Sequence, residues 1–282
     1  MSVVSGKENF DRIYNCQDPR PYFTTLRPLD YRIHRHAIPI FDRCAKLLSA
    51  HRNLRRIKMV DLCAGYGVNA ALLRFRVTLD DLYTLYDAES TPPLHAGVSL
   101  EDWDRRFFAS RLCGNGSIGP VVAIDKAERA VRYAESVGLV DYGASEDLED
   151  GEPSTELRHR LLGANLVTIT GGMGYIGPRT MGNILANVGP SILPWIIAFP
   201  LVGTPLGPFF RVFSDFGLRV EVWDDETFPQ RRVANGEDRL HFVSGVCGHA
   251  PSPSMSPEYL QTRLLCARPA DEADVLPLSD IV

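Results

Sequence analysis

The sequence predicts an α/β fold built around one mostly parallel sheet of seven strands. Short apolar runs alternate with amphipathic helical patterns, and glycine-rich turns follow two of these runs. The last two strand-like runs are joined by a polar turn with no room for a crossover helix. We therefore expect five parallel strands followed by a terminal antiparallel hairpin.

The first element is an expected helical N-terminal cap over residues 1–55. The apolar side chains of Ile33, Ile38, Phe41 and Leu48 recur there with helical spacing. An apolar run at 56–62 predicts the first strand, and a glycine turn and an apolar helix at 68–75 follow it. This order of strand, turn and helix is the one that a nucleotide site needs.

Residues 78–119 depart from the simple alternation and are interpreted as a helical insertion. Two helix-like segments lie there, at 79–89 and 100–113, and Ser99 is a candidate N-cap for the second, with Asp102 at N3.

The alternation resumes after the insertion. The later expected strands span residues 121–125, 139–145, 164–170, 195–202, 218–223 and 240–246. The later expected helices span residues 127–137, 155–162 and 208–216, with a further helix that begins at Pro178. A main domain at 56–268 is thus expected, followed by a loosely ordered tail at 269–282 that is rich in Pro, Asp and Ala.

Composition and charge narrow the classes of function. The chain has 282 residues, of which 45% are hydrophobic, and a formal net charge of -5 without a block of Lys and Arg, so nucleic acid is not expected as a partner. No signal peptide or apolar run of about 18 residues is present, so we expect a cytoplasmic protein without a membrane partner. The six cysteines show no metal-ligand spacing, and no metal is expected. A homodimer is compatible with the sequence.

The glycine turn at residues 61–67 reads Asp-Leu-Cys-Ala-Gly-Tyr-Gly. Glycines at the end of a strand let the backbone approach a ligand, and the next helix offers free N–H groups. A glycine turn without a ligand is the alternative. A dinucleotide site would have a third glycine where this chain has Ala70.

Two acidic positions follow later strands. Asp125 ends an apolar strand, where a carboxylate can accept both hydroxyls of a ribose, although an ordinary helix N-cap explains it equally well. Glu146, Asp147 and Leu148 follow the third strand, where polar and backbone groups can meet an adenine amino group. A solvated acidic turn is the alternative there.

Taken together, these motifs resemble those of the class I S-adenosylmethionine (SAM)-dependent methyltransferases, over residues 56–246. The resemblance implies a Rossmann-like fold with SAM as its cofactor. It places the methionine part of SAM near the glycine turn, the ribose at Asp125, the adenine near Asp147 and the sulfonium near residues 170–172. On this basis the expected cofactor-binding residues are Asp61, Cys63, Ala64, Gly65, Gly67, Asn69, Asp125, Lys126, Asp147, Leu148, Thr170, Gly171 and Gly172. Cys63 stands where the family usually has its first glycine.

The loop at residues 170–177 carries the candidate catalytic residue, Tyr175. Its hydroxyl could orient a substrate amine, or its ring could stabilise a sulfonium by about 0.5–2 kcal/mol, while simple packing is the alternative. The loop lacks the Asn/Asp-Pro-Pro-aromatic tetrapeptide of many enzymes that methylate base amines.

Two further groups are candidates for binding the substrate. Tyr14, Tyr22 and Tyr31 lie in the cap, where an aromatic seam between cap and core is the alternative role. Gln230 and Arg231 lie in the expected turn of the terminal hairpin, where a guanidinium could bind a carboxylate, and a solvated basic turn is the alternative.

We expect transfer of the SAM methyl group to an amine, hydroxyl or carboxylate of a small metabolite. A sulfonium carbon is already electrophilic, so the protein mainly aligns the nucleophile and excludes water. An alternative with the same fold and cofactor is that of the methyltransferase-like azetidine-2-carboxylate synthases, which cyclise SAM and release methylthioadenosine. A non-catalytic SAM-binding subunit and a dinucleotide oxidoreductase are the remaining alternatives.

Overall fold

The computed structural model describes residues 11–87, 99–114, 116–189, 193–234 and 258–282. Across these residues the chain forms one seven-stranded sheet in the order β3-β2-β1-β4-β5-β7-β6. Its strands are β1 (Ile57–Leu62), β2 (Ile118–Ile124), β3 (Tyr142–Ala144), β4 (Leu166–Thr170), β5 (Trp195–Phe199), β6 (Leu218–Arg232) and β7 (Tyr259–Pro269). The first five strands pair in parallel, whereas β7 is antiparallel to both β5 and β6. This arrangement confirms the predicted Rossmann-like fold class.

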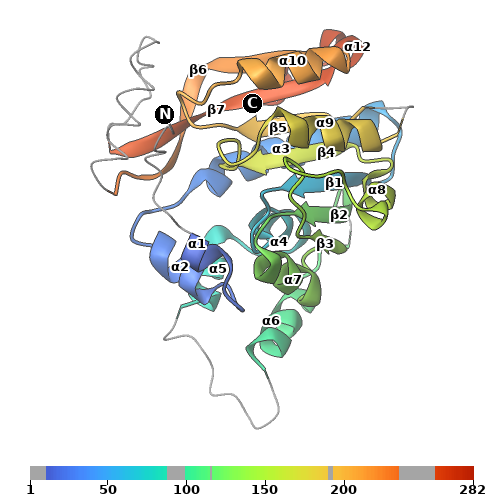
Figure 1. Ribbon diagram of the computed structural model, residues 1–282. Helices are drawn as coiled ribbons and strands as arrows, with labels where there is room; N and C mark the ends of the chain where they lie inside the picture. The colour runs from blue at the N-terminus through green and yellow to red at the C-terminus, as the bar shows by residue number, and fades with distance from the viewer. Residues whose placement is uncertain (1–10, 88–98, 115, 190–192, 235–257) are drawn as a thin grey trace.

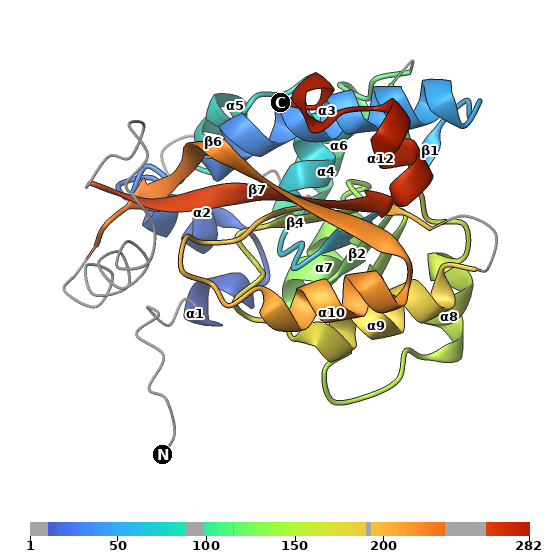
Figure 2. The same ribbon diagram turned by 90° about the horizontal axis from the view of Figure 1, so that it is seen from above.

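Helices cover both faces of the sheet (Figure 1). The longer and central ones are α3 (Ile33–His51), α4 (Val68–Arg74), α7 (Glu128–Ser136), α8 (Thr155–Leu161), α9 (Pro178–Asn187) and α10 (Gly207–Asp215). Viewed from above, α3 lies on one face, and α8, α9 and α10 lie on the other (Figure 2). A separate apolar core lies on each face of the sheet. Strands β4 and β5 are buried along their whole length, which explains their unbroken apolar sequences.

The N-terminal region divides into two parts. Helices α1 (Asp11–Tyr14) and α2 (Arg20–Leu26) form the cap. Helix α3 falls within the expected cap at residues 1–55, but it packs against β1 and β4. Ile33, Ala37 and Phe41 of α3 are fully buried, so this helix belongs to the main core.

The expected insertion contains α5 (Leu79–Leu85) and α6 (Leu100–Ala109), both shorter than predicted. Ser99 and Asp102 form the predicted N-terminal capping box of α6.

The C-terminal region differs most from the predictions. Gln230 and Arg231 do not lie in a turn, because β6 continues through them to Arg232. Since β6 is the edge strand of the sheet, it tolerates the polar residues that indicated a turn, and Pro229 as well. The strand predicted at 240–246 lies outside the described residues, and the antiparallel partner of β6 is β7.

The expectation of a loosely ordered tail is wrong. Residues Ala270–Val275 form helix α12, and Leu278–Asp280 form a 3₁₀ turn. Arg52 donates two hydrogen bonds of 2.8 Å to Glu272, and the Ile281 side chain is buried, so tertiary contacts hold this segment in place. None of the helices in the described ranges combines the length and apolar character needed to cross a membrane.

Candidate functional site

A pocket of about 770 Å³ lies at the carboxyl ends of β1, β2 and β4. This is where the chain order of the parallel strands reverses, which is the usual place for ligands in open α/β sheets. The predicted residues that line it are Tyr14, Tyr31, Cys63, Asp125, Lys126, Asp147, Leu148, Thr170, Gly171, Gly172 and Tyr175. The sequence motifs therefore converge on one pocket, although they come from segments far apart in the chain.

The turn between β1 and α4 contributes Leu62 and Cys63 to the pocket lining, whereas the predicted Ala64, Gly65 and Gly67 lie outside the lining. Cys63, Gly65 and Gly67 have φ values of 57°, 51° and 75°, so all three adopt the left-handed backbone conformation. Glycine adopts it freely, whereas Cys63 carries a strain of about 1–3 kcal/mol. The ring of Tyr14 lies 3.6 Å from where a Cβ on Gly65 would be, so the cap covers this turn closely. Ala64 is buried beside it.

Asp125 connects the end of β2 to the glycine turn. Its Oδ2 accepts a hydrogen bond of 2.8 Å from the backbone N–H of Gly65, and its Oδ1 accepts one of 2.9 Å from Ala127. Burial raises the pKa of Asp125, and these two backbone donors oppose the increase. Asp125 thus presents a carboxylate to the pocket between the turn after β1 and the start of α7.

Asp61 and Asn69 lie behind the pocket wall instead of lining it. Asp61 Oδ1 accepts hydrogen bonds from Asn69 Nδ2 at 2.8 Å and from Thr168 Oγ1 at 2.7 Å. Asn69 also donates to Thr170 Oγ1 at 3.0 Å, and Thr170 lines the pocket. Asp61 and Asn69 thus reach the pocket only through Thr170, and their role in cofactor binding stays a prediction.

His34 of α3 completes this buried network. Its Nδ1 lies 2.9 Å from Asn69 Oδ1, so Nδ1 carries the proton and Nε2 is a bare acceptor. Within the described ranges, His34 Nε2 and Asp61 Oδ2 have no hydrogen-bond partner. Burial raises the pKa of Asp61 to about 6 and lowers that of His34 to about 4, in both cases against the opposing effect of hydrogen bonds.

The segment after β3 closes another side of the pocket. Lys126 and Asp147 form an ion pair of 2.5 Å across its rim. Glu149, which sequence reasoning missed, lines the pocket and accepts hydrogen bonds from Gly177 N at 3.0 Å and from Thr180 N at 3.0 Å, both at the N-terminus of α9. Its partners are 28 and 31 residues away, so no local pattern could have revealed this role.

The six aromatic and polar candidates for catalysis and substrate binding differ in position. Tyr14, Tyr31 and Tyr175 line the pocket, and Tyr175 is 55% exposed. Tyr22 lies in a buried aromatic cluster with its ring 5.2 Å from that of Tyr14, so it supports the cap and does not line the pocket. Gln230 and Arg231 are buried in β6, close to the position of Gly171 and Tyr31.

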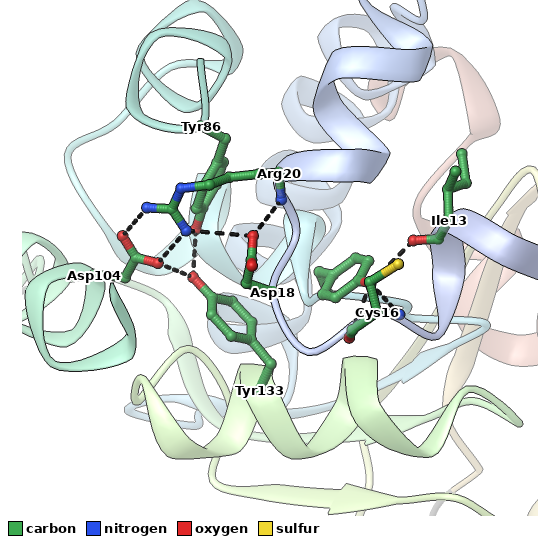
Figure 3. Close-up of polar contacts among 8 residues, drawn as sticks. Ile13, Cys16, Asp18, Arg20, Tyr86, Asp104 and Tyr133 are labelled. Carbon is green, nitrogen blue, oxygen red and sulfur yellow. Dashed lines mark hydrogen bonds and ion pairs between the residues drawn. The ribbon is translucent and has the colours of Figure 1, made fainter. Parts of the chain in front are cut away.

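The segment that carries Tyr14 and Asn15 is fastened to the core by polar contacts (Figure 3). The Tyr66 hydroxyl, which comes from the glycine turn, lies 3.0 Å from Ile13 O and accepts a hydrogen bond of 2.9 Å from Cys16 N. Arg20 pairs with Asp104 of α6 at 3.2 Å, and Asp104 also accepts a hydrogen bond of 2.9 Å from Tyr133 of α7. These contacts hold the two cap residues over the pocket.

No family model and no curated protein matches the sequence. Solved structures of methyltransferases are similar at low identity. The N-methyltransferase NodS from Bradyrhizobium japonicum WM9, in complex with S-adenosyl-L-homocysteine, is 10% identical, with 93% of this chain and 97% of that chain covered and a TM-score of 0.42. A TehB-like SAM-dependent methyltransferase from Corynebacterium glutamicum is 13% identical, with 79% and 86% covered and a TM-score of 0.39. The plantazolicin methyltransferase BamL is 9% identical, with 92% and 97% covered and a TM-score of 0.40.

Proposed function

We propose that the protein is a SAM-dependent enzyme that transfers the methyl group to a small molecule. The observation that carries this proposal is the meeting of the left-handed Cys63 at the start of the glycine turn, Asp125, and the backbone of Gly171 and Gly172 in one pocket at the carboxyl ends of β1, β2 and β4. This combination offers a backbone surface for a close-fitting ligand and a carboxylate for the hydroxyls of a ribose.

The residues of this chain fit the separate parts of SAM. Asp125 would hold the ribose, and Lys126, Asp147 and Leu148 would flank the adenine. The backbone at Gly171 and Gly172 would lie along the reacting end, beside the rings of Tyr14, Tyr31 and Tyr175. SAM supplies a methyl group on a sulfonium, which is electrophilic without further activation.

The protein's part in the reaction is then to orient the nucleophile and to exclude water. Correct positioning of two reactants can supply about 7–11 kcal/mol of the barrier. Tyr14, Tyr31 and Tyr175 line the pocket, and the Tyr175 hydroxyl or ring would orient an acceptor or face a cation.

A second candidate with the same fold and cofactor is the cyclisation of SAM by its own amine. A nucleophile within the same ligand needs no additional space beside the sulfonium. The products would be azetidine-2-carboxylate and methylthioadenosine.

The nucleoside product distinguishes the two reactions. Purified protein is incubated with SAM, with and without a panel of small amines, alcohols and carboxylic acids, and the nucleosides are identified by mass spectrometry. Methyl transfer yields S-adenosylhomocysteine only when an acceptor is present, whereas cyclisation yields methylthioadenosine from SAM alone. Binding of SAM with neither product would indicate a non-catalytic SAM-binding subunit.

A further inference from the structure

Glu149 gives the pocket a carboxylate oxygen that differs from the others in the described lining. The lining residues that carry carboxylates are Asp125, Glu146, Asp147 and Glu149. Both oxygens of Asp125 accept backbone hydrogen bonds, and both oxygens of Glu146 accept from Ser154. Asp147 uses Oδ1 for the backbone N–H of Glu149 and Oδ2 for Lys126. Among the carboxylate oxygens of the described lining, Glu149 Oε1 is therefore the one without a hydrogen bond or an ion pair.

The other oxygen of Glu149 holds this side chain in place. Its Oε2 accepts hydrogen bonds from Gly177 N at 3.0 Å, from Thr180 N at 3.0 Å and from Thr180 Oγ1 at 2.9 Å. A Cβ at Gly177 would overlap Oε1, so the missing side chain of this glycine makes room for the oxygen. Unlike Asp61 Oδ2, Glu149 Oε1 is not buried. The pocket thus contains an accessible carboxylate oxygen in a position that is fixed before a ligand binds.

The charges around Glu149 favour a ligand that carries a positive charge. Lys126 is the only lysine or arginine in the described lining, and its ammonium pairs with Asp147 at 2.5 Å. Four carboxylates therefore line the pocket against one ammonium. A protonated amino group brings both N–H donors and the complementary charge, whereas a ligand carboxylate near Glu149 would be repelled.

We propose that Glu149 binds a positively charged amino group of the acceptor molecule. The inference rests on the proposed function and narrows the acceptor to molecules that carry an amine. Glu149, Ile176 and Thr180 line the pocket, but none of them is assigned to a part of SAM, so this side is left for a second molecule. Tyr175 lines the pocket next to Ile176, and its ring can face a cation.

Ligand-observed NMR with propylammonium tests this subsite. Propylammonium is titrated into the ligand-free protein and into the protein saturated with S-adenosylhomocysteine, and propanol is the neutral probe of similar size. We expect propylammonium to bind in both states, because the nucleoside occupies another part of the pocket, and propanol to bind in neither. Loss of propylammonium binding on saturation would show that Glu149 faces an amino group of SAM itself and would overturn the assignment to the acceptor.

Matched variants connect the binding to Glu149. Glu149→Gln removes the charge but keeps an oxygen that can accept from the N-terminus of α9, and it is expected to weaken propylammonium binding by about tenfold or more. Glu146→Gln removes the same charge from a carboxylate whose two oxygens are both occupied, and it is expected to leave the binding nearly unchanged. Gly177→Ala keeps the charge but places a methyl group against Oε1. It is expected to weaken binding as well, which keeps the test informative if Glu149→Gln does not fold.

Equal propylammonium binding by the wild type, Glu149→Gln and Gly177→Ala would overturn the subsite, and so would the absence of binding to the ligand-free wild type. Equal weakening by Glu149→Gln and Glu146→Gln would also overturn it, because the general charge of the pocket would then explain the binding. Failure of S-adenosylhomocysteine to bind would instead contradict the proposed function, while the variants of the ligand-free protein still decide on the subsite.

Discussion

Cys63 shows how a single residue shapes the floor of the pocket. Its left-handed backbone, with a φ of 57°, directs its side chain towards Gly172 at the end of β4. The sequence identified both positions as part of the cofactor motifs, but it could not show that they depend on each other. That dependence arises only because β1 and β4 are neighbours in the sheet.

We predict that Gly172→Ala destabilises the protein and that Cys63→Gly restores much of the loss. The new Cβ would lie 2.4 Å from Cys63 Cβ and 2.6 Å from its Sγ, whereas the next nearest atom is 3.4 Å away. Overpacking of this kind costs about 1–3 kcal/mol in the free energy of unfolding, measured by urea denaturation. Gly182→Ala in α9 is the control, because its nearest neighbouring atom is at 4.0 Å. Additive effects of the two substitutions would contradict the direct contact.

Asp61 and His34 are predicted to give opposite contributions to the pH dependence of stability. Asp61 has its pKa raised to about 6 from 3.8, so the folded state holds its proton more tightly than the unfolded state does. Its contribution is present at pH values below 3.8 and is lost as the pH rises through 6. His34 has its pKa lowered to about 4 from 6.5, so its contribution is present above 6.5 and is lost as the pH falls through 4.

Urea denaturation of Asp61→Asn and His34→Gln at several pH values between these limits measures both effects. The stability advantage of the wild type over Asp61→Asn should decrease by about 1–3 kcal/mol as the pH rises across this range. Its advantage over His34→Gln should decrease as the pH falls. If the two stability differences changed in the same direction with pH, the buried network of His34, Asn69 and Asp61 would be contradicted.

At the scale of elements, the sequence predicted what local patterns determine. The structure confirms the strands predicted from the apolar runs of β1, β4 and β5, and the Ser99 capping box of α6. Each of these patterns is contained within a few consecutive residues. The full length of β6 could not be predicted, because its polar end is a strand only through pairing with β7. Helix α12 was missed for a similar reason. Its Glu272 accepts hydrogen bonds from Arg52, which follows α3 and is far away in the sequence.

Helix α9 provides a test of a long-range cap. Glu149 accepts hydrogen bonds from the backbone of Gly177 and Thr180 and, at 2.9 Å, from the Thr180 hydroxyl. We predict that Glu149→Ala lowers the free energy of unfolding by about 1–2 kcal/mol, because it removes both a cap and a negative charge at a helix N-terminus. The exposed Glu152 lies in the same segment, and Glu152→Ala is the control. Equal stability of the two variants would show that α9 does not need this cap.

In the whole molecule, the pair Arg20–Asp104 joins the cap to α6 of the insertion, and Tyr133 connects this pair to α7. The Asp104 side chain is fully buried, and the Arg20 side chain is 12% exposed. Burial raises the pKa of Asp104, while the Arg20 charge opposes this effect. Figure 3 shows how Tyr133 and Asp18 complete the group around these two residues.

We predict that Asp104→Asn loosens the cap. The substitution removes the fully buried one of the two carboxylates that pair with Arg20 and leaves only Asp18, at 3.4 Å. Breaking a buried pair costs at most about 3–5 kcal/mol. Faster proteolysis between residues 11 and 26, followed by mass spectrometry, and faster dissociation of S-adenosylhomocysteine are the expected results. Glu101→Gln on the same helix is exposed and serves as the control. Unchanged proteolysis and dissociation would show that the cap is held by other contacts.

The sequence predicted the grouping of residues in one pocket better than it predicted their contacts. Asp125, Gly171 and Tyr175 were found because each follows a strand, and the carboxyl ends of parallel strands meet at one edge. The position of Gln230 near the pocket depends on the path of the edge strand β6. The hydrogen bonds of Glu149 depend on the N-terminus of α9, which comes 28 residues later in the chain. These two relations belong to the assembled fold and not to any segment.

A calorimetric titration of the purified protein with S-adenosylhomocysteine tests most directly whether the pocket holds an adenosyl ligand. We expect binding at a single site, strong weakening by Asp125→Ala in a variant with an unchanged circular dichroism spectrum, and no binding of NAD. Absence of binding to S-adenosylhomocysteine, or equal binding by the wild type and Asp125→Ala, would contradict it.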